Sequence, residues 1–343
     1  MLSNKKKKIK YNEKTNYISK NHMILFSHNS TISNKNQFSN TIELYDAIPK
    51  YIWNNKIKFN YLSEMIITRY CLLQGQRLII KIKPAIIEKK KKIVFIYPGA
   101  REEILEDTLR KLAIEGKGQV IEGKFGVFFT LYELQKELKK INHGYNLNEI
   151  KEAIQVCQSA NIECSSKDKK IFISSGFFPV ISLSKKKCKI NNKNTCYVQF
   201  HPLVNYSIHN LSFREYNYNL CMQIRSPLAR YIYKRMSHYW RQANIMSPYT
   251  LSLFNFLKCS SRILSIRISE NIRAMKNSLT ILIEKKIINT YNTIKIKSNR
   301  KIVDVKYIIF PHDNFIQQTI NANKTTQKIK KISLNINNNL FKK

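Results

Sequence analysis

The sequence predicts an α+β protein made of two consecutive domains that share one order of elements. Each half of the 343-residue chain contains a pair of amphipathic helix patterns followed by two strand-like segments. Hydrophobic residues make up 43% of the chain, which is enough to bury real cores. Both ends are rich in Lys and Asn. We therefore expect folded domains at 37–210 and 211–322, a disordered basic arm at 1–36 and a disordered basic tail at 323–343.

Strand patterns open the first domain. They lie at 42–47, 66–73, 77–83 and 93–97, and the last three are rich in Ile, Val, Phe and Tyr. The apolar residues then recur with the period of a helix at 101–114, which Gly116 and Gly118 end.

The rest of the first domain has the order short strand, helix, turn, helix and β-hairpin. A strand is expected at 127–129, and the spacing of Thr130 and Glu133 is that of a capping box at the start of a helix. The further expected elements are helices at 131–141 and 147–159, hairpin strands at 162–164 and 171–174, and extra strands at 177–183 and 196–200. Together with the helix at 101–114, this is the order of a winged helix.

The second half repeats that order more clearly. Ser226 and Pro227 have the residue types of a helix N-cap and first helical position. The expected elements are helices at 227–240, 251–258, 266–286 and from Pro311 to about 322, and wing strands at 287–297 and 301–310. The long helix has an apolar face made of Ile268, Ile272, Met275, Leu279 and Leu282.

Net charge is the strongest sign of function. The chain has 60 Lys and Arg against 22 Asp and Glu, for a formal net charge of +38. Such an excess attracts polyanions: nucleic acid is the commonest target, and an anionic membrane surface is the main rival. Lys, Asn and Ile all have A/T-rich codons, so a bias in base composition is an alternative source of the charge, and we favour nucleic-acid binding over that alternative.

Cysteine usage and hydropathy indicate a cytoplasmic protein. The seven cysteines include no CxxC pair, which fits free thiols in a reducing compartment. No stretch approaches the roughly 20 apolar residues of a membrane helix, and the N-terminal segment lacks the apolar core of a signal peptide. We expect no membrane partner.

The helix at 266–286 carries the best candidate nucleic-acid surface. The second helix of a helix-turn-helix enters the DNA major groove, where Arg can pair with guanine and Asn with adenine. Its expected outward face is made of Arg267, Glu270, Arg273, Asn277 and Thr280, with Lys276 at the flank. Phosphate contacts are expected from Arg262 in the preceding turn and from Arg300 and Lys301 at the wing tip. The alternative is that any surface helix of so basic a protein carries such residues.

The corresponding helix of the first domain is less basic. Asn148, Lys151 and Gln155 face outward with only one cation among them, and Glu152 would repel phosphate. We expect weaker DNA contacts from this domain, or a protein–protein surface.

Several runs of sequence resemble plasmid replication initiators of the RepA type. SPLARYIYKRMSHYWRQA, YTLSLFNFLKCSSRILSIRISENIRAMKNSLTILIEKKIINTY and NRKIVDVKYIIFP are similar to their C-terminal winged helix. NTIELYDAIPKY, REEILEDTLRKLAIEG and GVFFTLYELQKELKKINH are similar to their N-terminal half. The likeness covers about 38–322, and its specificity lies in the order of many moderate matches.

This resemblance implies a function in DNA replication that involves no enzymatic step. It implies binding to repeated double-stranded origin sequences, the iterons, then origin opening and recruitment of host replication proteins such as the initiator and helicase. It maps the base readers onto Arg267, Arg273, Lys276 and Asn277. It also implies a homodimer that represses and a monomer that initiates. The alternative is a winged-helix transcriptional regulator, which would normally add an effector-binding domain.

Enzymatic alternatives lack their residues. Gly118 to Lys124 matches most of a P-loop, but Phe125 stands where the Mg²⁺-binding Ser or Thr belongs. A DNA-nicking enzyme needs two closely spaced metal-binding histidines, and His201 and His209 have seven residues between them. Adding Cys188 and Cys196 to that pair matches no usual zinc spacing. We expect no catalytic residue, metal or cofactor.

Overall fold

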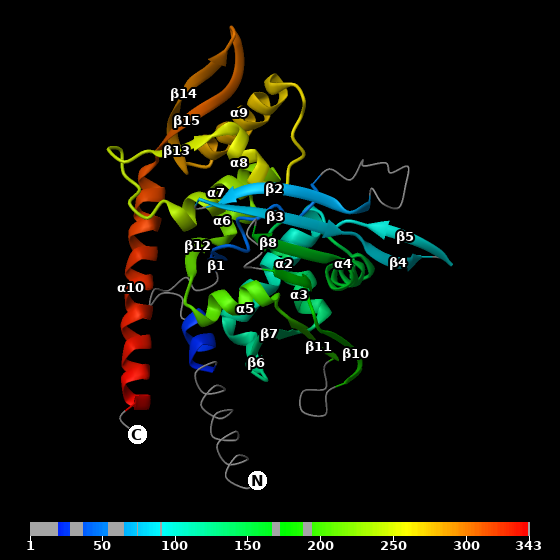
Figure 1. Cartoon of the computed structure of the whole chain (residues 1–343). Helices are drawn as coiled ribbons and strands as arrows, with labels where there is room; N and C mark the ends of the chain where they lie inside the picture. The colour runs from blue at the N-terminus through cyan, green and yellow to red at the C-terminus, as the bar shows by residue number, and fades with distance from the viewer. Residues whose placement is uncertain are drawn as a thin grey trace.

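The computed structural model describes residues 20–27, 37–53, 65–73, 75–89, 91–166, 172–187 and 194–341, and it is an α+β protein of open sheets (Figure 1). The predicted fold class is confirmed. Buried side chains from both halves form one continuous core. The domain boundaries near residues 37, 210 and 322 stay predictions.

The second half is a winged helix. Its elements are α7 (Pro227–Tyr239), β13 (Tyr249–Ser252), α8 (Leu253–Cys259), α9 (Ile268–Glu284), β14 (Ile288–Ser298) and β15 (Lys301–Pro311). The three strands form an antiparallel sheet in the order β13-β15-β14, and α9 packs on α7, α8 and this sheet. The expected helix at 251–258 is wrong at its start, because Leu251 pairs with Tyr307 as part of a strand.

The predicted apolar face holds α9 against its domain. Met275, Leu279 and Leu282 are fully buried, and Ile268 and Ile272 are partly buried against the same core. The exposed residues of α9 therefore have fixed positions on its opposite side.

The first half follows the winged-helix order with a rearranged sheet. Its elements are α2 (Ala100–Leu112), a π-turn (Ala113–Lys117), β6 (Gly118–Ile121), β7 (Lys124–Phe129), α3 (Leu131–Lys140), α4 (Leu147–Ser159), β8 (Asn161–Ser166) and β9 (Phe172–Gly176). The capping box is confirmed, because Glu133 N donates to Thr130 Oγ1 (3.1 Å) and Thr130 N donates to Glu133 Oε2 (3.0 Å).

Extra strands extend this half in two sheets. The additional elements are β2 (Ile67–Leu73), β3 (Gln76–Lys83), β10 (Ile181–Lys187) and β11 (Asn194–Gln199). The hairpin β8–β9 joins a sheet in the order β2-β3-β8-β9, whereas β7 lies in another sheet, β10-β11-β7-β6. The hairpin β4 (Ala85–Lys89) and β5 (Lys92–Ile96) forms its own sheet and packs against α4. β4 and β6 were not predicted from the sequence.

A strand pair joins the two halves. β1 (Phe38–Ile42) is antiparallel to β12 (Phe213–Asn217), and β1 also contacts α2 and α7. Two short helices, α5 (Pro202–His209) and α6 (Tyr218–Met222), flank β12. The predicted strand at 42–47 is wrong, because the chain turns at 43–47 once Ile42 has paired with Phe213.

The end of the chain is not the tail that the sequence predicts. A single helix, α10 (Asp313–Phe341), continues far beyond residue 322 (red in Figure 1). Phe315, Thr319, Ala322 and Ile329 are buried along one side of it, which explains why a polar, Asn-rich segment remains helical. Disorder is therefore the wrong expectation for 323–341.

The expected N-terminal arm also has a folded part. Residues 20–26 form a helical turn whose Met23, Leu25 and Phe26 are buried. The arm at 1–19 and 28–36, and residues 342–343, lie outside the described residues. No helix in the described part of the chain has the length and apolar character needed to cross a bilayer.

Candidate nucleic-acid interface

The exposed side of α9 carries the predicted readers. Arg273, Lys276 and Asn277 are exposed there, and Arg267 is exposed at the N-cap. Glu270, which the sequence analysis also placed outward, is half-buried and accepts a hydrogen bond from Ser265 Oγ. The N-terminal part of the helix thus presents three cations and one amide, and the carboxylate near them, Glu270, is held by the preceding turn.

A groove lies between this side of α9 and the start of α7. It has a volume of about 480 Å³, and its lining includes Arg262, Arg273, Asn277, Ser226 and Trp53. Arg262 and Arg273, which are eleven residues apart in sequence, therefore border one concavity. Arg262 Nε is buried and has no hydrogen-bond partner among the described residues. Arg267 and Lys276 are not part of this lining.

A buried asparagine fixes the turn before α9. Asn271 is 0% exposed, and its side-chain amide donates to Ser265 O (2.8 Å) and accepts from Ser265 N (3.0 Å). Arg267 N in turn donates to Ser265 Oγ (3.2 Å). The role of Asn271 was not predicted from the sequence, although a polar residue beside the apolar face of a helix is a usable signal.

The wing projects beyond the body next to α9 (Figure 1). Asn299 and Arg300 have positive φ angles of 47° and 65° at its tight turn, as a two-residue hairpin loop requires. Arg300 and Lys301 are exposed at the tip. The wing also exposes Lys295, Lys297 and Lys306, which the sequence analysis did not select although they alternate with apolar residues.

The corresponding surface of the first half is partly covered. Asn148, Lys151 and Gln155 are exposed on α4. Glu152 forms ion pairs with Lys89 Nζ (2.6 Å) from β4 and with Arg101 Nη2 (3.1 Å). These pairs hold the pKa of Glu152 below its usual value, against the opposing effect of burial. The hairpin β4–β5 therefore occupies space beside α4 that an uncovered recognition helix would leave free.

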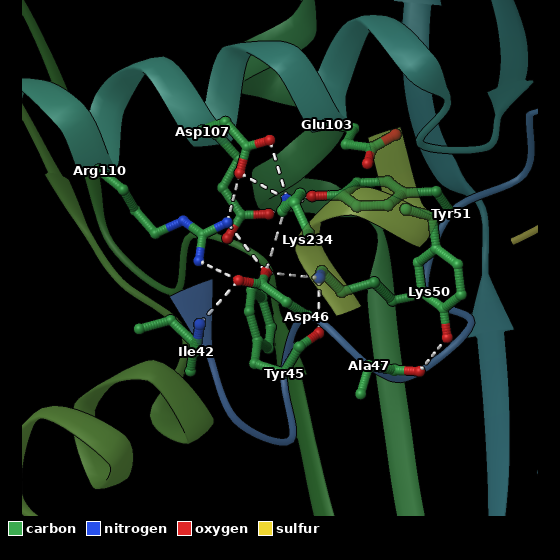
Figure 2. Close-up of polar contacts among 12 residues, drawn as sticks. Ile42, Tyr45, Asp46, Ala47, Lys50, Tyr51, Glu103, Asp107, Arg110 and Lys234 are labelled. Carbon is green, nitrogen blue, oxygen red and sulfur yellow. Dashed lines mark hydrogen bonds and ion pairs between the residues drawn. The ribbon is translucent and has the colours of Figure 1, made fainter. Parts of the chain in front are cut away.

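Buried charges connect the two halves (Figure 2). Arg110 Nη1 on α2 donates to Asp46 Oδ2 (2.9 Å), and Lys234 Nζ on α7 donates to Asp107 Oδ2 (2.9 Å). Burial alone would raise the pKa of Asp46, but Arg110, Lys234 and Lys50 hold it well below its usual range. Because α9 packs on α7, this network positions the reading surface relative to the first half.

A second connection reaches the helix-turn-helix directly. Arg69 Nη1 on β2 donates to Ser260 O (2.9 Å), which lies in the segment between α8 and α9. The thiol of Cys259 on α8 also donates to the backbone oxygen of Leu72 on β2 (3.3 Å). The sequence offers no local signal for these contacts, because each joins residues about 190 positions apart.

The residues weighed for enzymatic chemistry have structural positions. Glu122 and Gly123 of the P-loop-like run form the turn of the β6–β7 hairpin, with φ angles of 51° and 74°. His201 is buried and its Nδ1 accepts a hydrogen bond from Leu203 N (3.1 Å) at the start of α5. His209 packs edge-to-face on Phe125. Cys188 lies outside the described residues.

The fold places this protein in the class of tandem winged-helix proteins. Its second winged helix has a basic outer surface. No family model and no curated protein matches the sequence. Among solved structures, the chain is similar to RctB domains 2-3 (RctB-155-483), with 10% identity over 80% of this chain and 99% of that chain and a TM-score of 0.45. A selenomethionine derivative of domains 2 and 3 of RctB has 9% identity over 78% and 97% and a TM-score of 0.46. The Pi initiator protein in complex with iteron DNA has 9% identity over 61% and 91% and a TM-score of 0.41.

Proposed function

We propose that this protein is a plasmid replication initiator that binds repeated double-stranded sites at an origin. The observation that carries the proposal is the complete helix-turn-helix and wing of the second half. α9 presents Arg273, Lys276 and Asn277 on the side opposite its buried stripe, and the wing tip presents Arg300 and Lys301. A major groove about 12 Å wide admits one helix of this kind. The net charge of +38 supports a polyanionic partner.

We propose that some residues of this surface contact bases and others contact phosphates. Arg273 and Asn277 are four positions apart and border the same groove, so both can approach base edges together. The wing-tip cations, with Arg262 and Arg267, contact phosphates on either side. α4 contributes weaker contacts through Asn148, Lys151 and Gln155.

The first half is the proposed site of protein partners. Side chains on β2 and the β4–β5 hairpin are apolar and exposed, among them Tyr70, Leu72, Ile86 and Ile93. We propose that this surface forms the homodimer, and that the protein recruits the host initiator and helicase after opening the origin. The proposed location is the cytoplasm, with no membrane partner, cofactor or enzymatic step.

Footprinting on the DNA that flanks the gene tests this function. We expect protection of tandem direct repeats spaced by about two helical turns, because that spacing keeps bound molecules on one face of the duplex. Opening of the adjacent A/T-rich duplex should follow binding. Protection of a single promoter-proximal operator without opening would indicate the transcriptional regulator. Metal-dependent cleavage of the repeats would indicate a nicking enzyme. Equal binding to scrambled DNA would contradict both sequence-specific functions.

A further inference from the structure

An isoleucine at the start of α9 is exposed to an unusual degree. Ile266 is fully exposed and directly precedes Arg267, the N-cap of the helix. Ile268 and Ile272 of the same element are partly buried against the core. The free energy of keeping a whole isoleucine side chain in water is unfavourable, so a bound partner that covers it would gain affinity.

The structure holds this exposed side chain in a defined place. The backbone before it is fixed by the two hydrogen bonds between Asn271 and Ser265, and the backbone after it by the bond from Arg267 N to Ser265 Oγ. Asn271 is completely buried. A side chain presented in this way loses little conformational freedom when a partner covers it.

Packing within the chain does not account for Ile266. A hydrophobic residue just before an N-cap often packs on the fourth helical residue as a staple. Here that residue is Asn271, which is polar and hydrogen-bonds to Ser265 in the turn before α9. Nothing in the described part of the chain covers the isoleucine.

The surroundings of Ile266 indicate what covers it. Arg267 follows it, Arg273 and Lys276 lie on the exposed side of the same helix, and the wing adds further lysines. This charge complements a polyanion. On the major-groove edge of DNA, the apolar group is the C5-methyl of thymine, and recognition helices contact base edges with their N-terminal residues.

We propose that Ile266 determines part of the sequence specificity by packing against a thymine methyl group in the major groove. This inference rests on the proposed function, since it assigns a further residue to the same DNA-binding surface. The chain is rich in Lys, Asn and Ile, whose codons are A/T-rich, and this composition fits a replicon in which thymine is abundant.

Deoxyuridine substitution tests the contact, because deoxyuridine pairs like thymidine but lacks the methyl group. The bound sequence is first selected from a random duplex pool with the full-length wild-type chain. Each thymine of the selected site is then replaced singly. At one or two positions, we expect wild-type affinity to fall about fourfold, which is the effect of about one buried methyl group.

Two variants complete the design. Ile266→Ala should bind the thymine duplex more weakly and should no longer respond to deoxyuridine at those positions. Ile24→Ala removes an exposed isoleucine from the helix at residues 20–26, outside every proposed binding surface, and should keep the full response. Because both side chains are exposed, both variants should fold.

The outcomes separate this inference from the proposed function. Two results would overturn the inference, because each would mean that Ile266 does not read a methyl group. In the first, wild type binds every deoxyuridine duplex as tightly as the thymine duplex. In the second, Ile266→Ala keeps the wild-type response to deoxyuridine at every position. Selection of a defined sequence would still support the proposed function in that case. Failure to enrich any sequence would overturn both.

Discussion

Individual side chains of α9 divide into those that hold the helix and those available to DNA. Asn271 and Asn277 are chemically identical and six positions apart, yet one is completely buried and the other is exposed on the groove. Arg273 is exposed beside Asn277, whereas Met275 between them is buried. At this scale, burial decides whether a polar residue contributes to stability or to binding.

Substitution of Arg273 should affect specific binding selectively. If Arg273 pairs with a guanine, Arg273→Ala should weaken the free energy of binding by about 1–3 kcal/mol on the selected site and by much less on random DNA. Lys301→Ala should weaken both kinds of duplex alike, because a wing phosphate contact carries no sequence information. The measurement is the affinity of each variant for selected and scrambled duplexes at one salt concentration. Equal losses on both duplexes for both variants would mean that α9 is not the reader.

The two asparagines should separate stability from affinity. Asn271→Ala leaves the backbone N–H and C=O of Ser265 without their partner, so we expect the free energy of unfolding to fall by about 1–3 kcal/mol. Asn277→Ala should leave stability unchanged and lower affinity for the selected duplex. Urea denaturation and DNA binding are measured on both variants. A stability loss of the same size in Asn277→Ala would contradict the assignment.

The wing is the element that best shows how sequence-independent contacts are built. β14 and β15 are each eleven residues long and pair along almost their whole length, and the turn at Asn299 and Arg300 places cations at the far end. The wing strands also expose lysines along their length. Such an element contacts phosphates at a distance from α9, which adds affinity without adding sequence information.

The salt dependence of binding should report on the wing. Each neutralised phosphate contributes about −0.9 to the slope of log K against log salt. Replacing both Arg300 and Lys301 by Ala should therefore make the slope shallower by about 2. Lys136→Ala, which removes an exposed lysine from α3, is the matched control and should leave the slope unchanged. A wild-type affinity that barely varies with salt would rule out phosphate tracking altogether.

Across the whole molecule, buried polar groups set the relation of the two halves. The network of Asp46, Asp107, Arg110 and Lys234 bridges α2 and α7. His238 Nδ1 on α7 is 2.8 Å from Thr41 Oγ1 on β1, and His201 lies at the start of α5. Removing one member of a buried ion pair leaves the other charge uncompensated, so these contacts favour one relative arrangement of the halves.

The buried histidines should make stability depend on pH. Burial lowers the pKa of His201 and of His238 to about 3, below the unfolded value near 6.5. A lowered folded-state pKa contributes stability that is present above pH 6.5 and is lost as the pH falls toward 3. As the pH falls through this range, each histidine should therefore lower the free energy of unfolding by about 1.4 kcal/mol per pH unit.

His201→Asn isolates one of these contributions. Asn can accept the hydrogen bond of Leu203 N at the N-cap but does not titrate. Urea denaturation at pH 7 and pH 5 should show a smaller fall in the free energy of unfolding for the variant than for wild type. Burial raises the pKa of Glu215 to about 7, so this residue adds to the stability of the fold as the pH falls. Its contribution is the same in wild type and in His201→Asn. The same pH dependence in variant and wild type would contradict a buried, neutral His201.

The sequence by itself determined what depends on neighbours within a few turns of chain. The bounds of α4 are those expected, and the apolar stripe of α9, the start of α7 and the wing are close to expectation, because periodicity and caps are local properties. The exposed positions of Arg273, Lys276 and Asn277 follow from that stripe, so this part of the candidate site could be derived from the sequence.

Only the tertiary structure decided the features that need distant partners. β1 pairs with residues more than 170 positions away, and α10 remains helical because the folded body covers Phe315 and Ile329. The bridge from Asp107 to Lys234 and the groove shared by Arg262 and Arg273 likewise arise when packing brings separate elements together. Local patterns specify which face of an element is apolar, but the partner that buries it is chosen by the packing of the whole chain.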